Sequence, residues 1–87
     1  MNLYFIHCGF YDEEVSNGIY EFHVNIPIAA ASLESAKAKL RLNRDFKSKK
    51  MHIDGIQEIK TVDGFDIKLE ATSNQNTNIN NHLHRDL

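Results

Sequence analysis

The chain has 87 residues, a formal net charge of −2 and 41% hydrophobic residues, which are the proportions of an ordinary globular protein of one domain. Its apolar runs fall short of the roughly 20 residues that a membrane-spanning helix needs, and its single cysteine, Cys8, excludes an internal disulfide. With a first segment that lacks the pattern of a signal peptide, these features predict a cytoplasmic protein without membrane association.

Two strands are predicted in the first third of the chain. Residues 3–8 (LYFIHC) combine aromatic and β-branched residues and are apolar at both parities, which predicts a strand that is central in the sheet or covered on both faces. Residues 10–18 end in Ser-Asn-Gly and predict a loop. Residues 19–28 alternate between apolar and polar side chains, which is typical of a half-buried strand. Pro27 lacks an amide donor, so we expect this strand to end there or to lie at an edge.

One helix is predicted next, over residues 33–42. Ser32 is a good N-cap, because its hydroxyl can accept a hydrogen bond from a free amide of the first turn. Leu33, Ala36 and Leu40 then recur at helical spacing. Residues 43–50 are polar and predict a connector.

A hairpin is predicted after this connector. Residues 50–62 form the third predicted strand, with a β-bulge at Gly55. Asp63-Gly64 is a strong signal for a type I′ turn. Residues 65–69 alternate again and form the fourth strand. The predicted fold is therefore α+β, with the order β-β-α-β-β, an antiparallel or mixed four-stranded sheet and one helix packed on one face.

The composition changes after Glu70. Residues 71–87 contain five asparagines and very few apolar side chains, so they cannot bury enough surface to offset the entropy cost of ordering. We therefore expect a single domain over residues 1–70 and a disordered polar tail over residues 71–87.

Three segments resemble a family of short bacterial proteins known as the domain of unknown function DUF1543. They are MNLYFIHCG, YEFHVNIPIAAASLESAKAKL and MHIDGIQEIKTVDGFDIKL, and together they span nearly all of residues 1–70. The resemblance implies no activity that could be assigned to this chain. The resemblance implies that some members of the family carry a duplicated domain. Because this chain has one copy, a homodimer is favoured.

The predicted polar strand faces hold the best candidates for chemistry. Glu21 and His23 are two residues apart on one strand, and His52 and Asp54 are two apart on another, so each pair points to one side. If the two strands are close, these side chains could converge as ligands of Zn²⁺ or another first-row metal, or act as general acid and base. The plainer interpretation is a solvated polar face, and we assign no catalytic residue and no cofactor from the sequence.

A basic segment is the second candidate. Residues 37–50 contain seven basic residues and one acid, which could bind an anion or a nucleic acid. A single aromatic residue and the lack of a recognised motif do not favour nucleic acid, and a solvated helix face explains the charge equally well. The candidate anion ligands are Lys37, Arg41, Arg44, Lys47, Lys49 and Lys50.

The sequence leaves three functions open. A non-enzymatic module that forms homodimers or binds a protein partner fits a small core and a sheet with exposed edges. The alternatives are an enzyme that uses the histidine and carboxylate residues, and an anion binder that uses the basic segment.

Overall fold

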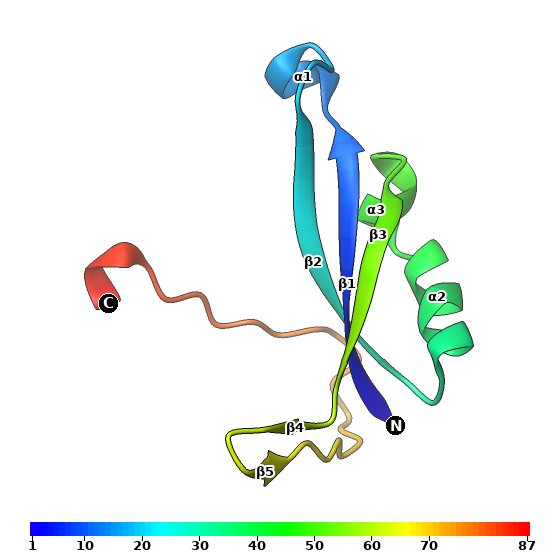
Figure 1. Cartoon of the computed structure of the whole chain (residues 1–87), viewed down its shortest axis with the longest axis vertical. Helices are drawn as coiled ribbons and strands as arrows, with labels where there is room; N and C mark the ends of the chain where they lie inside the picture. The colour runs from blue at the N-terminus through cyan, green and yellow to red at the C-terminus, as the bar shows by residue number, and fades with distance from the viewer.

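The computed structural model describes the backbone of all 87 residues and every side chain except those of Ser16 and Asp86. It contains a three-stranded antiparallel sheet, a separate two-stranded sheet and short helices, and it is an α+β fold. The main sheet has the order β2-β1-β3 and is built from β1 (Asn2–Tyr11), β2 (Glu21–Ala30) and β3 (His52–Ile59). The apolar first strand is therefore central, which is one of the two arrangements that its sequence left open (Figure 1).

Helices cover one face of this sheet. The helix α2 (Leu33–Arg41) begins at Ser32, whose hydroxyl accepts from the amide of Ser35 at 3.1 Å, so the predicted N-cap is confirmed. The short helix α3 (Arg44–Ser48) follows it and lies in the segment expected to be a connector. Its N-cap is Asn43, whose side-chain oxygen accepts from the amide of Phe46 at 3.0 Å. The single predicted helix was an undercount, because this local cap and the packing of Phe46 on the core stabilise another helical turn.

The core lies between β1 and the helices. Alternate residues of β1 point toward α2 and are buried, and Ala36 and Leu40 face them from that helix. The buried hydrophobic residues are Tyr4, Ile6, Cys8, Phe10, Ala30, Ala36, Leu40 and Met51. No buried polar residue accompanies them among the side chains that are described, so burial of apolar area holds this layer together.

The connection between the first two strands covers residues 12–20, so it has the predicted length but lies two residues later than expected. β1 continues to Tyr11, and a four-residue helix, α1 (Glu13–Ser16), follows it. The helix begins after Asp12, whose carboxylate accepts from the amide of Glu14 at 3.0 Å. It ends where Asn17 and Gly18 take positive φ angles. The turn predicted at Ser-Asn-Gly is therefore present, at the end of this helix.

The expected four-stranded sheet is not observed. Asp63 and Gly64 have φ angles of 51° and 84°, as the predicted turn requires, but they join β4 (Thr61–Val62) to β5 (Phe65–Asp66) in a sheet of their own. The reason lies in the register, because Leu3 of β1 pairs with Ile59 and the central strand ends at Asn2. The chain beyond residue 59 has passed the end of its partner, and the hairpin extends past the sheet (Figure 1).

The remaining chain has little regular structure. Residues 67–83 contain neither helix nor strand, and η1 (His84–Asp86) is a single 3₁₀ turn. Thr77 and Ile79 of this segment line a shallow hollow together with residues 24–28 of β2, and Figure 1 shows the chain beyond them leading away from the sheet and the helices. None of the helices in the described part of the chain is long and apolar enough to cross a membrane.

Candidate functional site: a histidine and carboxylate cluster on the open sheet face

The face of the sheet opposite the helices is open. Side chains along β1 alternate between the core and this open face, so the alternation determines which residues lie on it. Because Cys8 and Phe10 point into the core, His7, Gly9 and Tyr11 point to the open face. Each of these residues is paired in register with neighbours on the flanking strands. The cross-strand pairs are His7 with Asn25 and Gly55, Gly9 with His23 and His52, and Tyr11 with Glu21.

A β-bulge on β3 brings Asp54 to this face. The register between β1 and β3 shifts between His7 and Cys8, so that residue 54 has no direct partner. Ile53 and Ile56 both pack against the core although they are three residues apart. The bulge predicted at Gly55 is thus present, and it explains why Ile56 fell on the polar parity in the sequence.

Five side chains converge on the open face, and we call them the His-carboxylate cluster: His7, Glu21, His23, His52 and Asp54. The Oε1 atom of Glu21 lies 2.7 Å from Nε2 of His23 and 3.0 Å from Nε2 of His52. Asp54 contacts the same two rings, with Oδ2 at 3.5 Å from His23 and Oδ1 at 3.2 Å from His52. The ring of His7 lies 4.9 Å from that of His23, between centroids. The four residues that the sequence singled out are therefore together.

Gly9 makes this convergence sterically feasible. β2 and β3 are not neighbours, since β1 separates them and adjacent strands lie about 4.8 Å apart. A Cβ atom at position 9 would lie 2.3 Å from Oε1 of Glu21, 2.6 Å from Nε2 of His52 and 2.9 Å from Oδ2 of Asp54. The polar side-chain atoms from the two outer strands meet in the space that the missing side chain leaves.

Polar residues around the cluster fix its side chains. Tyr11 donates a hydrogen bond to Oε2 of Glu21 at 3.1 Å. The hydrogen bond with His23 holds the pKa of Glu21 below its ordinary value, and the bonds from Tyr11 and His52 act in the same direction. The hydrogen bond that Tyr11 donates to the Glu21 carboxylate raises the pKa of Tyr11. Glu21 is therefore a carboxylate at neutral pH, available as an oxygen ligand.

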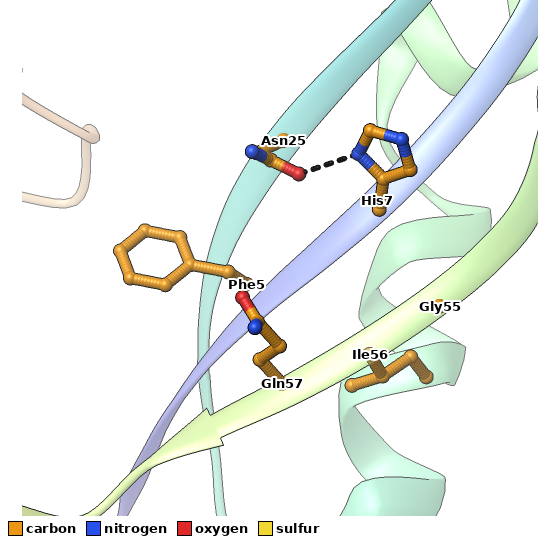
Figure 2. Close-up of a pocket in the computed structure, with 6 residues that line it drawn as sticks. All are labelled: Phe5, His7, Asn25, Gly55, Ile56 and Gln57. Atoms are coloured by element: carbon orange, nitrogen blue, oxygen red, sulfur yellow. Dashed lines mark hydrogen bonds between the residues drawn. The ribbon is translucent and has the colours of Figure 1, made fainter.

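A shallow hollow of about 380 Å³ adjoins the cluster on the same face. Figure 2 shows His7 at its edge, with a hydrogen bond of 2.8 Å between its Nδ1 atom and Oδ1 of Asn25. Phe5 and Gln57 lie on the other side of the hollow. His7 thus belongs to both features, and the hollow offers room for a small molecule beside the cluster.

The basic segment lies on the helical side and is separate from this site. Lys37 is paired with Glu34 at 3.1 Å, and Nζ of Lys49 lies 4.9 Å from the centre of the Phe10 ring. Lys49 and Lys50 line a hollow together with Glu13 and Glu14, so acidic side chains accompany them. Arg41 ends α2, and Arg44 and Lys47 belong to α3. The six candidate anion ligands do not join the His-carboxylate cluster.

Cys8 does not take part in the site. Its side chain is fully buried on the core face, and burial, followed by the charge of Asp54, raises the pKa of its thiol. The thiol is therefore protonated at neutral pH and closed to solvent, which is the state of a structural cysteine. His82 and His84 lie in the C-terminal segment.

Sequence reasoning missed three members of this site, namely His7, Gly9 and Tyr11. The signal that could have found them is the parity of the first strand. Once Tyr4, Ile6 and Cys8 are assigned to the core, the odd-numbered residues must face the other side. What the sequence could not supply is the position of the first strand between the other two.

Comparison with known proteins gives one match. The model of a family described as a Domain of Unknown Function (DUF1543) matches residues 19–69, which is more than half of the chain. Glu21, His23, His52 and Asp54 lie within the matched range, whereas His7 and Gly9 precede it. No curated protein and no solved structure matches the chain.

Proposed function

This chain belongs to the DUF1543 family, whose description assigns no activity, and we propose that its open sheet face binds a first-row divalent metal ion such as Zn²⁺. The observation that carries the proposal is the contact of Glu21, His23, His52 and Asp54 over the side-chain-free position 9. Imidazole nitrogens and carboxylate oxygens are the donors that zinc and its neighbours take in proteins.

The spacing of the donor atoms supports this function. A tetrahedral zinc ion with ligands at about 2.0–2.1 Å separates its ligand atoms by about 3.3–3.4 Å. The contacts from Glu21 and Asp54 to the two histidines span 2.7 to 3.5 Å. These contacts are close to the spacing that such an ion requires, and the half-exposed side chains can rotate to bring their donor atoms onto an ion. The core would not need to move, because none of the four side chains belongs to it.

The position of the cluster favours a site that also holds exchangeable ligands. His23 and His52 retain 45% and 47% of their side-chain exposure, so water can reach an ion on this face. Structural zinc sites are closed by four protein ligands, whereas catalytic ones keep a position for water or substrate. An ion that takes only three of these donors would keep such a position, and it could then lower the pKa of a bound water and polarise a substrate in the adjoining hollow. Metal-assisted hydrolysis is the chemistry that this arrangement supports best.

Metal titration of the purified chain tests the proposal. The protein is first stripped with a chelator and then titrated with Zn²⁺ in competition with a chromogenic chelator. We expect wild-type protein to compete, and the H23A/H52A double variant to lose at least about 100-fold in affinity, since half of the ligand set is gone. The matched control is H82A/H84A, which removes two histidines from the tail and should bind like the wild type. If H23A/H52A binds as tightly as the wild type, the proposed site is wrong.

We propose self-association through a sheet edge as a second, compatible function. Within the described chain, β2 and β3 each pair with β1 alone and leave their outer edges without a strand partner. Open edges are templates for pairing with another chain, and a chain of this size gains core by dimerising. Sedimentation velocity at about 100 μM checks this proposal. A sedimentation coefficient of a strict monomer at that concentration would exclude the homodimer.

A further inference from the structure

We propose that the His-carboxylate cluster holds two metal ions, with Asp54 as the carboxylate that bridges them. This inference rests on the proposed metal-binding function and specifies its stoichiometry. One ion would be held by His7, His23 and Asp54, and the other by Glu21, His52 and Asp54. Within each of these two groups, the ligand atoms all lie within 4.8 Å of one another.

The orientation of the Asp54 carboxylate is the first argument. Its two oxygens face different histidines, with Oδ2 3.5 Å from Nε2 of His23 and Oδ1 3.2 Å from Nε2 of His52. A carboxylate that offers one oxygen to each side is the geometry of a bridging ligand. In two-metal enzyme sites the ions lie about 3.5–4 Å apart. The bulge that leaves residue 54 without a partner on β1 places it between the two groups.

His7 is the second argument, because a single ion would not need it. Glu21, His23, His52 and Asp54 already supply four donors, which fills a tetrahedral shell. His7 is a fifth donor, and its ring lies 4.9 Å from the ring of His23, between centroids. The Nδ1 atom of His7 is hydrogen-bonded to Oδ1 of Asn25 at 2.8 Å. Because the amide oxygen is an acceptor, this contact favours the tautomer that carries its proton on Nδ1, in which the lone pair of Nε2 faces away from Asn25 and is open to a metal ion.

This support by Asn25 is the arrangement that metal-binding histidines have in proteins. Such histidines donate their other ring nitrogen to an oxygen, which fixes the tautomer and the direction of the ring. Asn25 is the β2 partner of His7 in the register, so the sheet itself sets the contact. A solvated surface histidine would not require it.

The stoichiometry of bound metal tests the inference. The full chain is loaded with Mn²⁺ or Zn²⁺, passed through a desalting column and weighed by native mass spectrometry. We expect two ions in the wild type and in the control H82A/H84A, and one ion in H7A and in the conservative variant H7Q. One ion in the wild type would overturn the two-metal inference and leave the proposed metal site intact, whereas no ion would overturn both.

A magnetic measurement on the wild type makes the test independent of how the variants fold. Two Mn²⁺ ions bridged by one carboxylate are exchange-coupled, so the loaded protein should give a coupled electron paramagnetic resonance spectrum. H7Q should give the six-line spectrum of an isolated ion. If the wild type binds two ions that are magnetically isolated, the second ion lies elsewhere and the bridging role of Asp54 is wrong.

Discussion

Replacing Gly9 with alanine separates the geometry of the proposed site from the stability of the fold. The added Cβ would lie 2.3 to 2.9 Å from ligand atoms of Glu21, His52 and Asp54, closer than nonbonded heavy atoms approach. All three atoms are at the ends of half-exposed side chains that can rotate away. The fold should therefore accept the methyl group, while the metal site should not.

The two effects have different magnitudes. Alanine restricts the unfolded chain and contributes about 0.4–1 kcal/mol to stability, while the ion pairs that it displaces are exposed and screened by water, so their loss has little effect on stability. We expect the free energy of unfolding of the metal-free protein to change by less than about 1 kcal/mol. Displaced ligands should reduce metal affinity by at least the 10–100-fold that loss of supporting contacts costs in metal sites.

Two assays on the same samples check this prediction. Urea denaturation of the metal-free protein gives the free energy of unfolding, and chelator competition gives the affinity for Zn²⁺. The matched control is Gly55→Ala, because Gly55 lies on the same face and its Cβ would meet no atom within 4 Å. Gly55→Ala should bind Zn²⁺ as the wild type does. Wild-type affinity in Gly9→Ala would refute the argument that the cluster occupies the space above position 9.

Three further predictions concern the core, the thiol and the tail. Leu40→Ala removes a fully buried side chain and should cost about 2–5 kcal/mol, seen as a lower urea midpoint; a loss below 1 kcal/mol would contradict its place in the core. Cys8 should react with a thiol reagent in urea and resist it in native buffer, because its side chain is buried and the pKa of its thiol is raised. Rapid labelling of the native protein would contradict the burial of this thiol. Deleting residues 71–87 should leave the urea midpoint and Zn²⁺ affinity unchanged if the polar tail is disordered, and a large loss of either would assign the tail a structural role.

Local sequence signals determined several elements of this protein. The hydroxyl of Ser32, the alternation along the second strand and the Asp63-Gly64 pair act over a few residues. The helix start and the turn are where they predicted, and the strand is present but lies two residues later than expected. Pro27 also lies in an edge strand, as its missing amide requires. Short-range hydrogen bonding and backbone sterics are sufficient for these features.

Local sequence signals did not determine whether the hairpin of β4 and β5 joins the main sheet. The alternation over residues 65–69 predicts a strand, but alternation stabilises a strand only when another layer covers its apolar face. Val62 and Phe65 remain 49% and 73% exposed, and β1 ends before it could extend the sheet to them. The length of the partner strand, which is a nonlocal property, decided that the hairpin stands apart.

For the candidate site, too, the sequence determined one part and the tertiary structure the other. The two-residue spacing of Glu21 with His23, and of His52 with Asp54, placed each pair on one strand face from the sequence alone. Only the tertiary structure placed β1 between these strands and Gly9 beneath their side chains. Strand order depends on contacts between residues far apart in the chain, and no local pattern encodes it. Sequence therefore determined which residues could act as ligands, and the order of the strands determined that they meet.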